Sequence, residues 1–211
     1  MRITNNVRHL LLFFVLCPGF WWGIINSTNV FREIGKSPHY FQGKLGSIYS
    51  YERTERIKAT KNANVDLGLP GRLVGGFFFN EFTIVVDEFF DLTSFLSPRF
   101  FFQAGDGSLM SPPRTEPIPL VLFPAWVLGI ITIVRKKNFG LLKILIILVF
   151  IPYILGQKNL VFLWPVMILY IFIAREGIMN IGNIKTKNNY LHLFVVYGVF
   201  VVLRSFYLLL R

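Results

Sequence analysis

Five long apolar blocks constrain the fold of this chain more than any other feature of its sequence. Each block is close to the roughly 20 residues that a helix needs to cross about 30 Å of hydrocarbon. The chain has 211 residues and a mean hydropathy of +0.55, and a single globular core would not divide its apolar residues into blocks of this length. We therefore predict an all-α integral membrane protein with about five transmembrane helices, over Val7–Ile25, Pro117–Val134, Gly140–Gly156, Asn159–Ala174 and Tyr190–Leu210.

The blocks divide the chain into three regions. Residues 1–26 form the predicted first transmembrane helix, residues 27–116 a long loop, and residues 117–211 a four-helix transmembrane region. The first block has the length of a signal peptide as well. Bulky Phe20, Trp21 and Trp22 follow Pro18, however, where a cleavage site needs small residues. This mismatch favours a span that is not cleaved.

The basic residues indicate how the spans are oriented. The net charge of +11 could suit nucleic acid, but region 27–116 holds ten basic and ten acidic residues, so the excess lies on and between the apolar blocks. The links at Arg135–Lys137 and Arg175–Lys187 are positive, as is the start of the chain. Positive links face the cytoplasm. We predict a multi-pass protein of the cell membrane that binds no nucleic acid, with a cytoplasmic N-terminus, an extracytoplasmic loop and an extracytoplasmic C-terminus.

Residue types that carry catalysis or bind metals are sparse in this chain. Cys17 is the only cysteine, and His9, His39 and His192 are far apart in the sequence. No phosphate-binding glycine loop, metalloprotease helix or Cys/His cluster can be assembled from them. The sequence therefore predicts neither a metal site nor a cofactor.

The long loop changes composition along its length. Its first part, to Gly71, is polar and mixed in charge, and Tyr51–Lys61 is typical of a solvated helix. The second part, Gly75–Phe102, is rich in phenylalanine, with acidic residues recurring among the aromatic ones. This pattern predicts a helix along the membrane surface with its apolar face in lipid. Phe-rich faces also pack on protein, so a helix that covers the outer ends of the spans is an equal alternative.

The order of motifs from Tyr51 to Gly177 resembles the late portion of GT-C glycosyltransferases of the protein-mannosyltransferase and aminoarabinose-transferase type. That family shows an extracytoplasmic Arg/Glu helix, an Arg before an aromatic and Asn-containing stretch, a Phe-rich segment ending in Gly-Asp, and then Pro-bearing spans. The matching elements here are Arg53 with Glu55, Arg72, Phe79 with Asn80, Leu96-Ser97-Pro98, Phe100–Phe102, Gly105-Asp106, Pro119, Pro124, Gly129, Pro152 and Pro165.

The resemblance implies transfer of a sugar from a polyprenyl-phosphate donor at the outer membrane surface. The family's catalytic carboxylate lies in an N-terminal loop with no counterpart in this sequence, so the resemblance implies no catalytic residue here and a possible partner chain that supplies the N-terminal half. Basic side chains at the level of the lipid headgroups can bind an anionic lipid phosphate through charged hydrogen bonds. The candidate substrate-binding residues are Asp106, Arg114, Lys158 and Arg99, and we expect Asp106, Arg114 and Lys158 to share one polar pocket under the segment Phe77–Phe102.

Two departures from the family pattern leave a second interpretation open. Glu81 stands where family members often carry a basic residue, and Lys158 stands where they carry Arg or His. The alternative is a non-catalytic membrane scaffold or assembly subunit whose loop binds a protein partner. A transporter is less favoured, because the predicted spans contain no carboxylate.

The predicted orientation can be tested with topology reporters. A reporter fused after Arg211 should be extracytoplasmic and one inserted at Asn138 should be cytoplasmic, because the positive links remain inside. Alkaline phosphatase and fluorescent protein fusions measure the two positions independently. A cytoplasmic C-terminus would remove one span from this topology.

Overall fold

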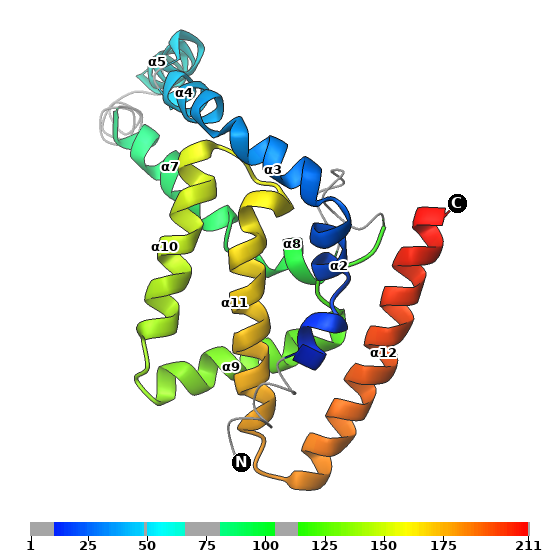
Figure 1. Ribbon diagram of the computed structural model, residues 1–211. Coiled ribbons are helices and arrows are strands. Elements are labelled where there is room, and N and C mark those ends of the chain that lie inside the picture. The colour runs from blue at the N-terminus through cyan, green and yellow to red at the C-terminus, as the bar shows by residue number, and fades with distance from the viewer. Residues whose placement is uncertain (1–10, 49, 66–80, 104–113, 211) are drawn as a thin grey trace.

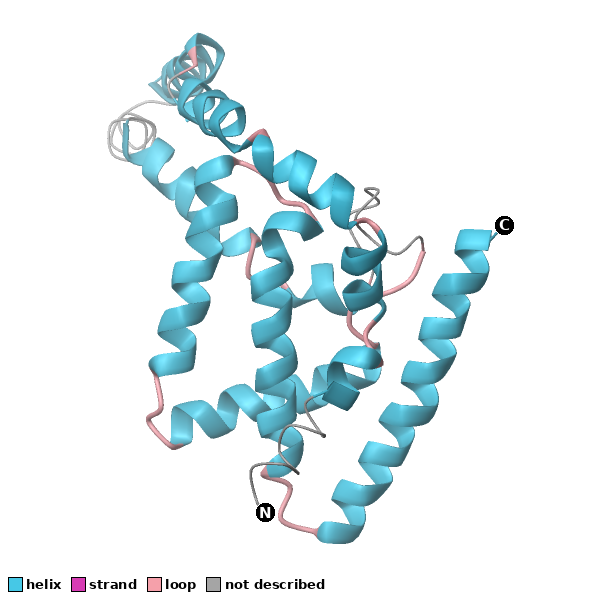
Figure 2. Ribbon diagram, in the orientation of Figure 1, coloured by secondary structure: helices cyan, strands magenta, loops and turns pink. Residues whose placement is uncertain are grey.

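A computed structural model of the chain describes residues 11–48, 50–65, 81–103 and 114–210, and within these ranges the regular structure is helical, with no strand (Figures 1 and 2). The all-α prediction is therefore confirmed. The helices are α2 (Pro18–Ile25), α3 (Ser27–Gly35), α4 (Ser37–Ile48), α5 (Tyr51–Val65), α7 (Glu81–Ser94), α8 (Pro98–Phe102), a 3-10 turn η1 (Leu120–Leu122), α9 (Phe123–Arg135), α10 (Gly140–Leu155), α11 (Leu160–Met179) and α12 (Ile184–Leu210).

Two of the described helices, α11 and α12, are long and apolar enough to cross a membrane. A third span is possible if η1–α9 and α10 count together, but the chain bends by 119° between them. Membrane association is thus supported, whereas the expectation of five spans stays a prediction. The first apolar block is interrupted in its described part: Cys17 is extended because the residue before a proline disfavours the α-helical region, and α2 starts at Pro18.

The α10–α11 turn and the positively charged links lie at opposite ends of the bundle (Figure 1). Gly156 adopts a left-handed conformation (φ 62°) that ends α10, and the Asn159 side chain accepts a hydrogen bond from the Phe162 amide at the start of α11. At the other end, the Lys136 ammonium donates to the Asn180 side chain at 2.7 Å. This bond joins the α9–α10 link to the α11–α12 link, so both positive links share one side of the molecule, as the predicted orientation requires.

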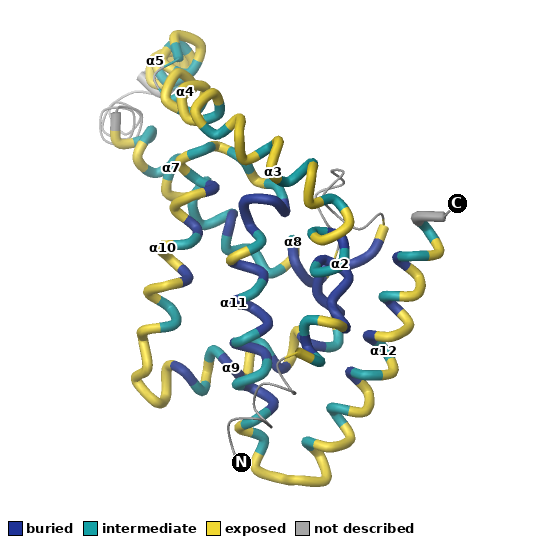
Figure 3. The backbone as a smooth tube through the Cα atoms, in the orientation of Figure 1, coloured by how far each residue is buried: buried dark blue, intermediate teal, exposed yellow. Residues whose placement is uncertain are grey.

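Helix α11 is the centre of the core (Figure 3). Most of its side chains are buried, on every side of the helix, which is the pattern of a helix enclosed by its neighbours. Tyr170, near its middle, contacts the rings of Phe101 and Phe102 from α8 and Trp126 from α9. The Tyr170 hydroxyl donates to the Leu96 carbonyl at 2.6 Å. The phenylalanines of α8 therefore belong to the protein core and not to a lipid-facing surface.

Helices α9 and α11 touch backbone to backbone at two glycines. A Cβ atom added at Gly129 would overlap the carbonyl oxygen of Ile173, and one added at Gly177 would overlap the carbonyl oxygen of Ala125. Ala125 and Gly129 are four residues apart on α9, the small-xxx-small spacing that lets membrane helices approach closely. No larger residue fits at either glycine without moving a helix.

Helix α12 lies at the edge of the bundle (Figure 1), where its Phe194 is fully buried and stacks on the ring of Phe13. The Tyr197 hydroxyl donates to the Glu116 carboxylate at 2.6 Å, and the hydroxyls of Thr115 and Ser205 are 2.9 Å apart. Tyr197 and Ser205 are two helical turns apart, so both bonds use one face of α12. Glu116 is only 8% exposed. These polar contacts fix α12 against the segment that leads into α9.

The glycine crossing predicts a specific loss of stability. Replacing Gly129 or Gly177 by alanine should destabilise the protein by about 1–3 kcal/mol, because the added methyl group meets backbone atoms that cannot rotate away. Thermal unfolding in detergent, followed by circular dichroism, measures the effect as a lower midpoint. Gly182→Ala is the matched control, since nothing lies within 4 Å of its added Cβ. Equal midpoints for all three variants would contradict the crossing.

Candidate functional site

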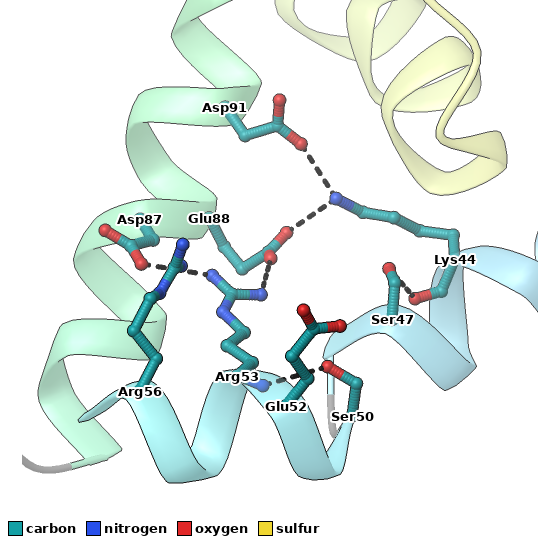
Figure 4. A pocket seen from close by; sticks show the side chains of 9 residues that line it. All are labelled: Lys44, Ser47, Ser50, Glu52, Arg53, Arg56, Asp87, Glu88 and Asp91. Atoms are coloured by element: carbon teal, nitrogen blue, oxygen red, sulfur yellow. Dashed lines mark hydrogen bonds and ion pairs between the residues drawn. The ribbon is translucent and has the colours of Figure 1, made fainter. Parts of the chain in front are cut away.

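Helix α7 has an acidic face and an apolar face. Asp87, Glu88 and Asp91 point toward α4 and α5, as Figure 4 shows. On the other side Phe82, Val85 and Phe89 recur at helical spacing and are exposed. The Phe-rich segment thus divides into two parts: the apolar side chains Val85 and Phe89 of α7 are exposed, whereas Phe101 and Phe102 of α8 are buried in the bundle. The alternative in which Phe-rich helices pack on protein therefore holds for α8, whereas a position of α7 along the membrane surface stays a prediction.

Glu88 is the centre of an ion-pair network between α4, α5, α7 and α10 (Figure 4). Its carboxylate oxygens lie 2.6 Å from Arg53 Nη1 and 2.9 Å from Lys44 Nζ. The Tyr153 hydroxyl on α10 donates to the same carboxylate at 2.9 Å. Two outer pairs complete the network: Lys44 with Asp91 at 2.7 Å and Arg53 with Asp87 at 3.4 Å.

The surroundings of Glu88 strongly favour its ionised form. Burial opposes ionisation, but hydrogen bonds from Arg53, Lys44 and Tyr153 outweigh it and lower the pKa of Glu88 to about 2. The same pairs raise the pKa of Lys44 and of Arg53 above their usual values, against the effect of burial. Glu88, Lys44 and Arg53 are therefore all charged at physiological pH.

An open cavity of about 600 Å³ lies beside this network. Charges of both signs and two hydroxyls line it, from α4, α5, α7 and the α4–α5 connection: Lys44, Ser47, Ser50, Glu52, Arg53, Arg56, Asp87, Glu88 and Asp91. A smaller hollow of about 280 Å³ continues past Lys44 toward the α10–α11 turn at Gly156 and Gln157. Within the described ranges, no group of three His, Cys, Asp or Glu side chains is placed to hold a metal ion. The cavity suits a polar or charged solute.

Two of the predicted site residues lie near the α10–α11 turn and α8. Lys158 Nζ is 5.8 Å from the ring centroid of Phe95, a cation–π contact. Phe95 itself is buried, at 3% exposure. Arg99 follows Phe95 by four residues, on α8, and its side chain is exposed. Among the described residues, neither cation is paired with a carboxylate, so both remain available to an anion.

The remaining predicted site residues are described only in part. Arg114 is exposed and has a left-handed backbone (φ 53°), one residue before Thr115, which is bonded to α12. Asp106 lies outside the described residues. No contact within the described ranges joins Arg114 to Lys158 or to Arg99. The shared pocket of Asp106, Arg114 and Lys158 therefore stays a prediction.

Sequence reasoning did not identify Lys44 or the role of Glu88. It noted Arg53 and Glu55 through the resemblance and the acidic residues of α7 through their recurrence, but nothing in the sequence pairs two segments 35 residues apart. In the structure Arg53 binds Glu88, whereas Glu55 makes only an exposed pair with Lys58 at 3.0 Å. The spacing of Asp87, Glu88 and Asp91 on one helical face was the available signal.

Comparison with known proteins finds no match: no family model, no curated protein and no solved structure is significantly similar to this chain.

The network predicts that the charge of Glu88 holds α4 and α5 in place. Glu88→Gln should loosen α4 and α5, because it removes charged hydrogen bonds worth about 1.5–3 kcal/mol each. Limited trypsin digestion of the protein in detergent measures this as faster cleavage within residues 44–65. Glu55→Gln is the control, since it breaks only an exposed pair.

The pH dependence of this opening follows from the lowered pKa of Glu88. A depressed carboxyl pKa contributes stability that is present above its ordinary value of 4.5 and is lost as pH falls toward about 2. Protection measured with an acid-active protease should therefore fall across this window in the unmodified chain and less steeply in Glu88→Gln. Identical acid profiles would contradict the assignment.

Proposed function

We propose that this chain is a membrane-embedded module of a lipid-linked-sugar glycosyltransferase that positions the donor lipid and does not itself catalyse transfer. The observation that carries the proposal is the pair of cations at the α10–α11 turn and on α8. Lys158 lies over the buried ring of Phe95, and Arg99 is exposed on α8, four residues further along the chain. An anionic phosphate at the membrane surface would neutralise both.

The surroundings of these cations support a lipid ligand. Exposed Phe82, Val85 and Phe89 extend along α7, which leads into Phe95. The outer surface of α10 adds Ile147, Ile151 and Ile154, all exposed and apolar. A polyprenyl phosphate needs both features, a cation for its phosphate and an apolar surface for its chain.

The charges of the large cavity suit the polar end of such a donor. Sugar hydroxyls bind carboxylates and guanidinium groups through hydrogen bonds, and Glu52 and Arg56 are exposed at the cavity wall. Glu88 lies beside the cavity, but both of its carboxylate oxygens are paired and it stays ionised. We therefore assign Glu88 a structural role, not a catalytic one. A catalytic carboxylate would then come from a partner chain.

The alternative is a non-catalytic scaffold that binds a protein partner. The closed ion-pair network favours it, because charges that neutralise one another hold helices together and leave little field for a charged ligand. The exposed outer face of α12, with Val196, Phe200 and Leu203, offers such a partner a surface within the membrane.

A measurement of polyprenyl-phosphate binding distinguishes donor positioning from the scaffold function. Lys158→Ala should weaken binding of a short-chain polyprenyl phosphate by about tenfold, which is about 1.4 kcal/mol and matches the loss of one charge-assisted contact. Microscale thermophoresis of the full chain in nanodiscs measures the affinity. Lys143→Ala, the same charge change at the opposite end of α10, is the control and should bind as the unmodified chain does.

Two results would contradict donor positioning. Equal affinities for Lys158→Ala and the unmodified chain would remove the proposed phosphate contact and favour the scaffold. Sugar transfer by the purified chain alone, from a polyprenyl-phosphate donor, would show that a catalytic group lies within it.

A further inference from the structure

Helices α2, α3 and α4 carry an exposed apolar stripe that the sequence pattern did not single out. Ile24, Phe31, Ile34, Phe41 and Leu45 follow one another at separations of seven, three, seven and four residues, which keeps them on one side of a helix. All five are exposed, and Phe31 reaches 74%. We call these five residues the α2–α4 stripe.

The three helices follow one another closely along the chain, with only Asn26 and Lys36 between them. Each of these two residues accepts the first hydrogen bond of the next helix, from the Val30 amide to the Asn26 carbonyl at 2.9 Å and from the Tyr40 amide to the Lys36 carbonyl at 3.1 Å. Figure 1 shows α3 and α4 nearly in line along one end of the bundle. Along α3 and α4 the stripe therefore forms a single elongated surface, and Ile24 extends it onto the end of α2.

A different face of these helices packs against the rest of the protein. Val30 and Tyr40 pack against the core, and Lys44 is bound to α7. At about 100° per residue, Phe41 and Leu45 lie roughly 60–100° around the helix from Lys44. The stripe thus borders the packed face and points away from the bundle.

We propose that the α2–α4 stripe lies in the headgroup region of the bilayer, with its apolar side chains in the outermost hydrocarbon. The first argument is continuity with the membrane-embedded part of the chain. The stripe begins at Ile24, within the first apolar block, beside α2 residues that pack on α11: the Gly19 carbonyl accepts a hydrogen bond from the Trp164 indole at 3.2 Å. A bilayer that surrounds α11 therefore reaches the start of the stripe.

The second argument is charge. Arg32 and Lys36 are the exposed basic residues of this segment, whereas Lys44 is bound to α7, and Glu33 is its acidic residue. Glu33 is turned away to bind Lys36 at 2.7 Å and the Tyr40 hydroxyl at 2.6 Å. A helix with a basic polar side and Phe, Ile and Leu on the other is typical of segments that lie on anionic membranes.

Pairing with a second copy of the chain fits the stripe less well. Its spacing approaches a heptad pattern, which would permit a coiled coil. Pro38 and Ser27 occupy the two intervening positions of that pattern, however, and α2, α3 and α4 are three short segments. A lipid surface tolerates both features, because it requires no interlocking side chains.

Spin labels on single cysteines test the membrane location. Phe31→Cys and Phe41→Cys carry the nitroxide at exposed positions, so neither label disturbs packing, and His39→Cys, exposed away from the stripe, is the control. Native Cys17 is fully buried, and the chain without an added cysteine gives the labelling background. The full chain is reconstituted in phosphatidylcholine vesicles containing phosphatidylglycerol.

Collision with oxygen, which concentrates in lipid, is compared with collision with a water-soluble nickel chelate. The ratio of the two should be several-fold higher at positions 31 and 41 than at position 39. Equal, water-like ratios at all three positions would overturn the proposal. Spin–spin broadening at 31 and 41 that disappears on dilution with unlabelled chain would overturn it as well, in favour of a second copy. The readout does not depend on glycosyl transfer or on donor binding.

Discussion

The approach of α9 and α11 at Gly129 and Gly177 is the contact on which the rest of the structure depends. Because two backbones meet there, α9 crosses α11 and does not run beside α10, and the chain must bend by 119° before α10 can return. In a membrane, helices gain little from the hydrophobic effect between themselves, so close packing of small residues supplies much of their association. The absence of a side chain at Gly129 and at Gly177 thus sets the relative directions of α9, α10 and α11.

Helices α4, α5, α7 and α8 are attached to this bundle by chemistry of two kinds. Helix α8 is held by aromatic packing around Tyr170, in the apolar interior. Helices α4, α5 and α7 are held by ions around Glu88, with the Tyr153 hydroxyl as the link to α10. The aromatic contacts keep α8 and its cation Arg99 in a fixed place, whereas the ion pairs leave an open cavity with polar walls. The proposed lipid phosphate, near Arg99, and the proposed sugar, in the polar cavity, would therefore bind at the same end of the protein.

Membrane residence and the all-helical fold could be predicted from the sequence, because block length and hydropathy are properties of single segments. The short turn between α10 and α11 follows in the same way, because only two residues separate the blocks Gly140–Gly156 and Asn159–Ala174. The crossing at Gly129 was not predictable, since a glycine in an apolar block has no pattern that names its partner on another helix. The Glu88 network was missed for a related reason: Lys44 and Arg53 belong to segments that read as solvated. Of the candidate site residues, Lys158 and Arg99 are exposed in the structure and could bind an anion. A pocket that Lys158 shares with Asp106 and Arg114 remains a prediction.

The separation of the Gly129 and Gly177 backbones in a lipid bilayer is the most direct test of this architecture. It can be measured in an experimental structure of the full chain in a nanodisc, with a bound antibody fragment to aid alignment. We expect the two glycines in backbone contact, with no side chain between them and with α9 strongly inclined to α10. A structure in which Gly129 lies away from α11, with side chains between the two helix backbones, would contradict it.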